Sequence, residues 1–223
     1  MPYGLGADST AILLMFLADS AAHGLEPDLS DLIAVHAITV DEFVDSLDYV
    51  NRLVLPLLRT RSVRLVQVCR GGKSDIDGVL VLDDSRTPRR IHAAGPWRLS
   101  DELRAAGTVP QLANGQRRCS IRFKGWDLDN WAAAEFGART FRRVIGYHAD
   151  ELGRAEKGTA IQHRLNTEAG RIVCEPRYRP GWTGPPWRCT CSPPRVSPLK
   201  SRTAPLCVDQ TEGSACDSPD TRT

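Results

Sequence analysis

Residues 32–39 (LIAVHAIT) form a nearly continuous apolar run in which β-branched side chains are frequent. A strand of this composition is buried on both faces, as the strands of parallel sheets are. Residues 63–68 (VRLVQV) predict a second strand, and residues 44–61 between them have apolar side chains at helical spacing, with a kink expected at Pro56. A strand, a helix and a strand joined by a right-handed crossover predict an α/β fold with a doubly wound parallel sheet.

The same alternation continues along most of the chain. Residues 79–82 (VLVL) predict a further strand or a hairpin arm, and residues 141–146 predict a later strand. Three more helices are predicted, each ended by a glycine: residues 9–23 before Gly24, residues 98–106 before Gly107 and residues 127–136 before Gly137. In an open sheet of this type the ligand lies at the carboxyl ends of the strands, so we expect the loops after Thr39, Val68 and Ile145 to border the site.

Opposite charges nearly balance over the 223 residues, with 29 lysines and arginines against 27 aspartates and glutamates, a formal net charge of +2. No overall field therefore favours nucleic acid or a membrane surface as a partner. No apolar run reaches the ~20 residues of a membrane-spanning helix, and no basic region precedes the first apolar stretch. The chain is expected to be a soluble cytoplasmic protein with one main domain.

The last fifty residues differ in composition from the rest, because they hold five of the seven cysteines and nine of the fifteen prolines and have no helical or strand periodicity. We therefore predict one folded domain over residues 1–175 and an irregular or disordered tail over residues 176–223. Enrichment in Pro, Arg, Cys and Ser without periodicity is also typical of a shifted reading frame. The tail after Arg177 is accordingly expected not to be native.

A glycine-rich turn, GLGADST, starts at Gly4 and runs directly into the apolar stretch of the first predicted helix. Gly4 and Gly6 let an anion approach the backbone closely, and the N–H groups of a helix N-terminus bind phosphate. Ser9 and Thr10 offer further donors, and either Asp8 or Ser9 can cap the first turn. The segment lacks the Gly-Lys-Ser/Thr ending of a P-loop, so it predicts phosphate binding of another kind, with a plain turn as the alternative.

A phosphate loop of this kind follows a buried strand, yet only Met1 and Pro2 precede Tyr3. Two explanations are open: the natural start lies upstream of Met1, or the sheet has lost its central strand. We favour the first, because an open edge in the middle of a sheet leaves many backbone hydrogen bonds unmade.

Four basic side chains lie within eight residues of each other, namely Arg117, Arg118, Arg122 and Lys124. Guanidinium groups bind phosphate or sulfate with two parallel hydrogen bonds. The segment therefore predicts an anion site, and a solvated basic loop is the alternative.

Carboxylates follow two of the predicted strands, Asp41, Glu42 and Asp45 after the first and Asp150 and Glu151 after the last. Carboxylates at strand ends can hold Mg²⁺ against nucleotide phosphates, so this ion is a candidate cofactor. Capping of the next helix is the alternative, and for Asp45 the two interpretations are equally supported.

Residues 3–10 (YGLGADST) resemble the pyrophosphatase loop of the phosphoadenosine phosphosulfate (PAPS) reductase-like family, which is part of the PP-loop superfamily. Three later segments follow in the family's order. Residues 43–46 (FVDS) are similar to its Phe-Pro-Glu-Thr, residues 117–124 (RRCSIRFK) to its Cys-Cys-x-x-Arg-Lys, and residues 144–151 (VIGYHADE) to its Gly-x-Arg-x-Asp-Gln/Glu-Ser. Four matches in order are far more specific than any one of them.

The resemblance implies the Rossmann-like fold of the adenine nucleotide α-hydrolases and binding of ATP, PAPS or adenosine phosphosulfate (APS). It implies cleavage between the α and β phosphates, or sulfur transfer, as the reaction. Phosphate binding would fall to Gly4, Gly6, Ser9, Thr10, Arg117, Arg118, Arg122 and Lys124, and catalysis to Asp8, Asp150 and Glu151.

Two departures from the family pattern bear on the reaction. Relatives with a [4Fe–4S] cluster carry a Cys-Cys pair and a later Cys-x-x-Cys pair, whereas here Arg118 precedes Cys119, and Cys189 and Cys191 are one residue too close, so no iron–sulfur cluster is expected. The Glu-Cys-Gly-x-His context of the reductases' mobile thiol is also missing, which argues against thioredoxin-linked reduction. One alternative function is a non-catalytic nucleotide-binding or partner protein, such as a subunit in sulfur-based DNA modification, and another is a degenerate relic. The sequence leaves open whether the chain binds a protein partner or forms a homodimer.

Overall fold

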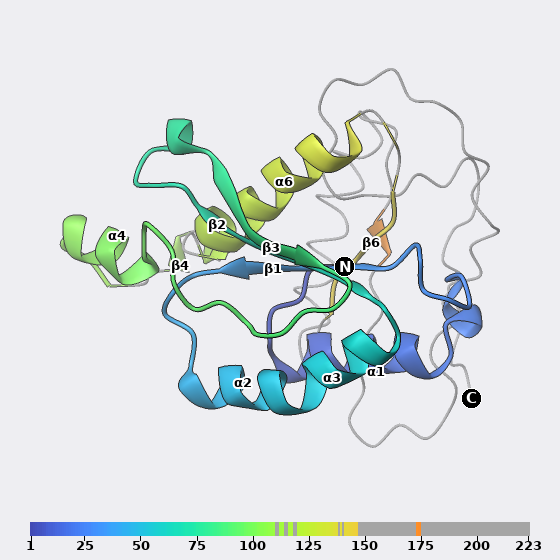
Figure 1. Cartoon of the computed structure of the whole chain (residues 1–223). Helices are drawn as coiled ribbons and strands as arrows, with labels where there is room; N and C mark the ends of the chain where they lie inside the picture. Colours follow the sequence, from blue (N-terminus) through green and yellow to red (C-terminus); the bar gives the residue numbers. More distant parts are fainter. Residues whose placement is uncertain are drawn as a thin grey trace, which may run out of the picture.

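A computed structural model of the chain describes residues 1–109, 112–113, 116–117, 120–137, 139, 141–146 and 173–174. Three strands form the main sheet, and helices lie on both of its faces (Figure 1). On one face are α1 (Ala7–Ala18), α2 (Val44–Tyr49) and α3 (Leu55–Thr60), and on the other is α6 (Trp126–Phe136). The protein is therefore a mixed α/β fold, as predicted, and the predicted tail from residue 176 onward lies outside the described residues.

The first two strands are parallel. β1 (Ile33–Ile38) pairs with β2 (Arg64–Arg70), with Ile33 opposite Arg64 and Ile38 opposite Cys69. All of β1 after Ile33 and all of β2 after Arg64 are buried, because side chains on both faces of the sheet are covered by helices. This confirms the strand, helix and strand order predicted from the apolar runs.

The third strand corrects the predicted sheet. β3 (Val79–Ser85) pairs with β2 in the antiparallel direction, with a register shift between Gln67 and Val68, so the sheet is mixed rather than all parallel. Only residues 71–78 join the two strands, and a parallel pair needs a crossover of a dozen or more residues. The hairpin arm that the sequence left open as an alternative for residues 79–82 is therefore the correct one.

The crossover between β1 and β2 is helical throughout. α2 continues into a π-helical turn, η2 (Val50–Val54), and then into α3, in which Pro56 occupies the first turn. Proline has no N–H to donate, so the regular α-helical ladder cannot pass through it. The kink predicted at Pro56 thus takes the form of a wider turn immediately before it.

The start of the chain lies alongside β1. Val35 N donates to Met1 O at 2.9 Å, and Tyr3 N donates to Val35 O at 2.7 Å, which makes a parallel bridge between Pro2 and Val35. Residues 1–3 therefore pair with β1 at the position where a strand was expected directly before the glycine-rich loop. The chain turns from them into the glycine-rich loop.

Two apolar clusters hold the layers together. Tyr3, Leu13 and Leu65 belong to the cluster between the sheet and α1 to α3, and Val66 and Trp131 belong to the cluster under α6. Alternate residues of β2 thus point to opposite layers, as the period of a strand requires.

Ion pairs also connect α6 to the sheet. Arg64 donates to Asp84 of β3 at 2.8 Å and 2.7 Å and to Glu135 of α6 at 2.6 Å.

The remaining elements are short. They are η1 (Ala21–His23), η3 (Asp75–Asp77), α4 (Leu99–Ala105), β4 (Leu112–Ala113), β5 (Gln116–Arg117), η4 (Ile121–Gly125), β6 (Arg143–Val144) and β7 (Val173–Cys174). The predicted helix ends are confirmed at Gly107 and Gly137, which have positive φ. The helix predicted to run to His23 ends at Ala18 instead, and Gly24 ends the separate turn η1. None of the helices in the described part of the chain is long and apolar enough to cross a membrane.

Candidate functional site

The glycine-rich loop ends in a helix N-terminus without a capping side chain. Gly6 is the N-cap residue of α1 and is exposed, and the Ser9 hydroxyl donates to Gly6 O at 3.1 Å instead of accepting from the first turn. Asp8, the acidic residue of that turn, does not cap it either. The predicted capping by Asp8 or Ser9 is therefore wrong, and the first N–H groups of α1 remain available to an anion.

Leu5 anchors this loop from its middle. Its φ is +58°, in the left-handed region that a branched aliphatic residue rarely adopts, and its side chain is buried in the core beside α1. Gly4 and Gly6 on either side are exposed. The buried leucine thus holds the loop in one conformation while both glycines face solvent.

Tyr3 and Thr10 close the base of the loop. Their hydroxyl groups lie 3.2 Å apart in a buried hydrogen bond, and burial raises the pKa of Tyr3 to about 12. Thr10 is 5% exposed, so it supports the loop from inside and is not a free donor to phosphate. The predicted phosphate-binding role of Thr10 does not fit this geometry.

A buried histidine that the sequence analysis did not single out lies behind the loop. His36 of β1 is fully buried, and its Nδ1 lies 3.0 Å from Tyr3 O. A carbonyl oxygen only accepts, so Nδ1 carries the proton. Its Nε2 has no hydrogen-bond partner among the described residues, and burial lowers the pKa of His36 to about 4.

The strand next to the loop ends in a second strained residue. Val40 follows Thr39 at the carboxyl end of β1 and has a φ of +68°, a genuine outlier for a β-branched side chain. Strain of this kind persists where the surrounding structure fixes it, often at binding sites. The two other non-glycine residues with positive φ in the described part of the chain, Leu29 and Ser62, lie before β1 and β2.

Lys124 lies at the end of β1. Its ammonium group is 3.2 Å from Glu42 Oε1, and the Thr39 hydroxyl donates to the same carboxylate oxygen at 2.9 Å. The charges of Glu42 and Lys124 both reach the imidazole of His36. Lys124 therefore lies at the end of the strand whose His36 contacts Tyr3 before the loop.

Arg122 lies at the end of β2 instead. Its guanidinium group is 2.9 Å from Glu102 and 4.0 Å from Asp75, and its backbone oxygen accepts from Arg70. Arg70 is buried, with its guanidinium group 4.6 Å from the centre of the Trp126 ring. The basic segment predicted as one anion site is thus divided between two strand ends, and both described members are ion-paired.

Asp127 is a second buried group that the sequence pattern missed. It lies in the first turn of α6, is 0% exposed, and neither of its carboxylate oxygens has a hydrogen-bond partner among the described residues. Burial raises its pKa to about 7, although the nearby charge of Arg70 opposes this.

Gly146 confirms that the last predicted strand approaches the loop. A Cβ on Gly146 would lie 2.7 Å from Ile12 Cδ1 and 3.3 Å from the carbonyl carbon of Asp8. The buried side chain of Ile12 would have to move to admit a Cβ, so Gly146 lies directly against the first turn of α1. The loop after Ile145 is predicted to border the site, and its first residue, Gly146, lies beside α1, whereas residues 147–150 lie outside the described residues.

Two of the three carboxylates predicted after β1 have structural partners. Asp41 accepts from Ser100 N at 2.6 Å and from its hydroxyl at 2.9 Å, so it caps α4, and Glu42 holds Lys124. Asp45 lies exposed in the first turn of α2. No group of three or more His, Cys, Asp or Glu side chains in the described residues is arranged to hold a metal ion.

The predicted site residues are therefore partly brought together. Gly4, Gly6, Asp8 and Ser9 share the N-terminus of α1, and Lys124 lies at the neighbouring strand end. The structure describes only the backbone of Arg117, within β5, and Arg118, Cys119, Asp150 and Glu151 lie outside the described residues.

Comparison with known proteins gives no relative. No family model matches the chain, and neither the curated proteins nor the solved structures contain a significant match.

Proposed function

We propose that the chain binds the phosphate groups of an adenine nucleotide, ATP or a PAPS-type nucleotide, at the loop from Gly4 to Ser9. The observation that carries the proposal is the exposed, uncapped N-terminus of α1, preceded by a glycine-rich loop and by residues paired in parallel with β1. Helix N-termini of this kind attract phosphate through their N–H groups and their dipole.

The position of the loop in the fold supports the same proposal. In open α/β sheets, ligands bind outside the carboxyl ends of the strands. The loop follows Tyr3 at that edge, with the end of β1 on one side and Gly146 against α1. A doubly wound, Rossmann-like completion of the sheet beyond residues 1–3 is part of this proposal, as is the adenine moiety, and both rest on the family resemblance.

Lys124 is the basic side chain best placed to join such a site. It pairs with Glu42 at 3.2 Å, and the phosphate of a bound nucleotide would compete with this carboxylate for the ammonium group. Asp8 in the first turn of α1 would be the reacting carboxylate in cleavage between the α and β phosphates or in sulfur transfer.

A protein that binds the nucleotide without reacting with it is the second candidate. The ion pairs of Lys124 with Glu42 and of Arg122 with Glu102 favour it, because both cations are already neutralised in the free chain. Release of pyrophosphate from ATP, or of sulfate from PAPS by hydrolysis, separates the two candidates. If the chain is an enzyme, Asp8→Asn should stop the release of this product without lowering the affinity for the nucleotide. If the chain only binds the nucleotide, neither the parent chain nor any variant should release the product.

Isothermal titration with ATP and PAPS tests the binding itself. A Cβ on Gly6 meets no other atom within 4 Å, so Gly6→Val folds and extends its side chain into the space a phosphate would occupy. We expect the affinity to fall about tenfold or more, since a hydrogen bond to a charged group contributes ~1.5–3 kcal/mol. Ala22→Val, at an exposed position past the other end of α1, is the matched control, and equal affinities for both variants would refute the proposal.

A further inference from the structure

Most basic side chains in the described part of the chain already have a partner. Arg64 and Lys124 are held by carboxylates, and Arg59, Arg86 and Arg142 donate to backbone oxygens. Four of the described lysine and arginine side chains make neither a hydrogen bond nor an ion pair with other described residues. They are Lys73, Arg89, Arg90 and Arg98, and two of these are adjacent in sequence.

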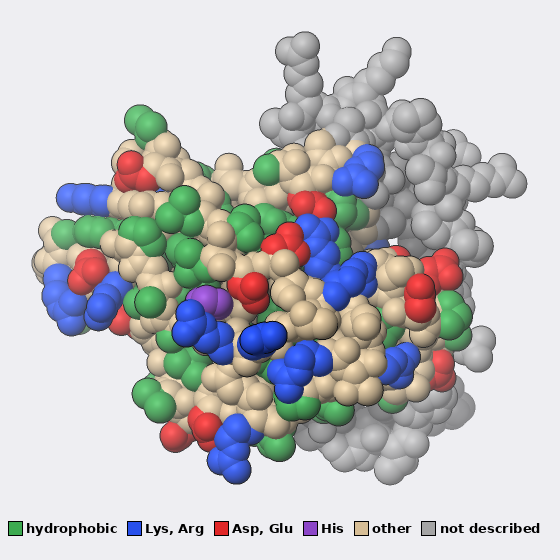
Figure 2. Space-filling model, in the orientation of Figure 1, with side chains coloured by type: hydrophobic (Ala, Val, Ile, Leu, Met, Phe, Trp, Pro, Cys, Tyr) green, Lys and Arg blue, Asp and Glu red, His purple; other side chains and the backbone are tan. Residues whose placement is uncertain are grey.

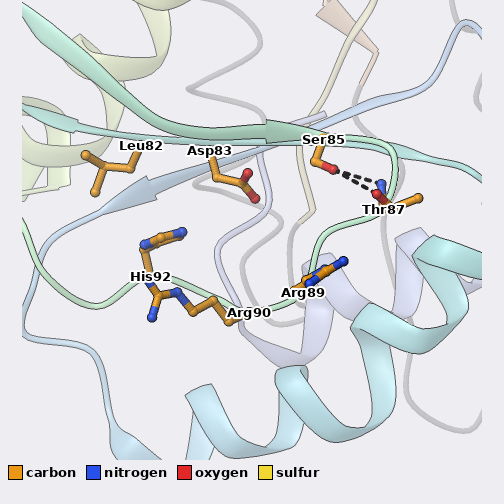
Figure 3. Close-up of a pocket in the computed structure, with 7 residues that line it drawn as sticks. All are labelled: Leu82, Asp83, Ser85, Thr87, Arg89, Arg90 and His92. Atoms are coloured by element: carbon orange, nitrogen blue, oxygen red, sulfur yellow. Dashed lines mark hydrogen bonds between the residues drawn. The ribbon is translucent and has the colours of Figure 1, made fainter.

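Arg89 and Arg90 line a pocket of about 510 Å³ between the end of β3 and the segment that follows it (Figure 3). His92 lies with Arg90 at one end of this pocket, and Ser85 and Thr87 lie toward the other. Figure 2 shows basic side chains and a histidine close together on this face of the molecule.

The pocket is distinct from the loop at α1. β3 is separated from residues 1–3 by β1 and β2, and Ser85 lies opposite Leu65 near the amino end of β2. Arg86 accordingly reaches Ser62 and Ser30, which precede the parallel strands. The proposed nucleotide site lies at the other edge, where these strands end.

The wall that carries the arginines is fixed in place. The fully buried amide of Gln67 donates to Arg90 O at 2.9 Å and accepts from His92 N at 2.7 Å. Asn51 accepts from the backbone N–H of the buried Ile91 at 2.7 Å. Because the backbone is held from both sides, the side chains of Arg90 and His92 are presented without a loop having to order.

The opposite wall supplies groups of a different kind. Asp83 accepts from the Gln67 amide through Oδ2 at 3.1 Å, and its Oδ1 has no partner among the described residues. The hydroxyl groups of Ser85 and Thr87 lie 3.3 Å apart. A pocket for a bare anion would not include a carboxylate, whereas a ligand with both a phosphate and hydroxyl groups uses the arginines and the carboxylate together.

We propose that this pocket binds a sugar phosphate, with Arg89 and Arg90 on the phosphate and Asp83 accepting from a sugar hydroxyl. The same chemistry is present in a free sugar phosphate and in the ribose phosphate of a 5′-nucleotide. Ribose 5-phosphate and AMP are therefore the two probes, and the stronger binder identifies the source.

The test is isothermal titration of the full chain. We expect Arg89→Gln with Arg90→Gln to weaken the stronger-binding probe about tenfold or more, because charge-assisted hydrogen bonds to phosphate are lost. Lys73→Gln with Arg98→Gln removes two charges outside the pocket that have no partner among the described residues, and it is the charge-matched control. An equal loss in both double variants, or no binding of either probe to the parent chain, would overturn the proposal.

Two further titrations sharpen the result. Asp83→Asn keeps an acceptor for the Gln67 amide. We expect this variant to bind ribose 5-phosphate more weakly than the parent chain and to bind inorganic phosphate with the same affinity. An unchanged affinity for ribose 5-phosphate would refute the role of Asp83. Gly6→Val should leave this pocket unaffected, so failure of the nucleotide site and failure of this pocket are distinguishable. Loss of ribose 5-phosphate binding in Gly6→Val would assign the ligand to the α1 loop and overturn the proposal.

Discussion

His36 donates a hydrogen bond from Nδ1 to the backbone oxygen of Tyr3 at 3.0 Å, and this bond joins the middle of β1 to the residue that begins the glycine-rich loop. The imidazole is fully buried and neutral, and its pKa is lowered to about 4, mainly by burial. The position of the loop and the charge of one buried ring are therefore coupled.

Acid should weaken the fold through His36. An unfolded histidine takes up its proton near pH 6.5, whereas the folded one does so near pH 4, so its stabilising contribution is complete above pH 6.5 and is lost as the pH falls toward 4. The loss is on the order of 3 kcal/mol. His36→Asn keeps a donor near Nδ1 but does not titrate, and urea unfolding at pH 7.5 and pH 5 should show a smaller loss of stability on acidification than in the parent chain. Equal losses would contradict the coupling.

Asp127 should act in the opposite direction. Its pKa is raised from 3.8 to about 7, so its contribution is present below pH 4 and is lost as the pH rises through 7, where the buried carboxylate must ionise. Asp127→Asn removes this ionisation and is expected to raise the free energy of unfolding at pH 8 by ~1–3 kcal/mol. Denaturant melts at pH 8 and pH 5 measure the difference. Asp129→Asn on the same helix is not a suitable control because Asp129 pairs with Arg143. Asp45→Asn serves instead, because Asp45 is exposed and has no partner among the described residues.

The Lys124–Glu42 pair should regulate nucleotide affinity. Glu42→Gln keeps the acceptor for the Thr39 hydroxyl and frees the ammonium group, which lies 3.2 Å from Glu42 in the parent chain. We expect ATP to bind about three- to tenfold more tightly, since a partly exposed ion pair is worth ~1 kcal/mol. Lys124→Gln should weaken ATP by a similar factor. Titrations at two salt concentrations check both, and unchanged affinities in both variants would exclude Lys124 from the site.

Gly146 should tolerate a side chain poorly. A Cβ there would come within 2.7 Å of Ile12 Cδ1 and 3.3 Å of the Asp8 carbonyl carbon, so Gly146→Ala must displace the buried Ile12 side chain, at a cost of ~1–3 kcal/mol in stability. A Cβ on Gly125 meets only Ser120 O at 4.0 Å, which makes Gly125→Ala the matched control. Thermal melts of the two variants should differ clearly. Equal melting temperatures would mean that residues 143–146 do not pack against α1 as described.

The helices and the parallel strands could be predicted because their patterns are local. The apolar runs at β1 and β2 and the glycines after α4 and α6 specify these elements without knowledge of the rest of the chain. The direction of β3 was left open between a further strand and a hairpin arm, although the short connection after Arg70 already excluded a parallel crossover.

The site was harder to predict because its geometry depends on packing between distant segments. Arg122 and Lys124 are two residues apart in a helical turn, so they face different strand ends and cannot form one cluster. His36 is hidden in an apolar strand, and Asp127 resembles an ordinary acidic residue at a helix start. A polar residue inside an apolar run was the one signal in the sequence that His36 is buried. Asp127 gave no such signal, because it becomes buried only where α6 packs onto β2.

β3 is the edge strand of the sheet that the structure describes, and its composition bears on how copies of this chain behave at high concentration. An edge strand can template pairing with another molecule unless charge or a bulge interrupts it. Asp83 and Asp84 put two adjacent carboxylates on β3, and the register shift opposite Gln67 and Val68 breaks its regular ladder. A second strand that docked there would meet the Asp83 carboxylate and a misaligned backbone, so this edge disfavours edge-to-edge pairing between copies of the chain.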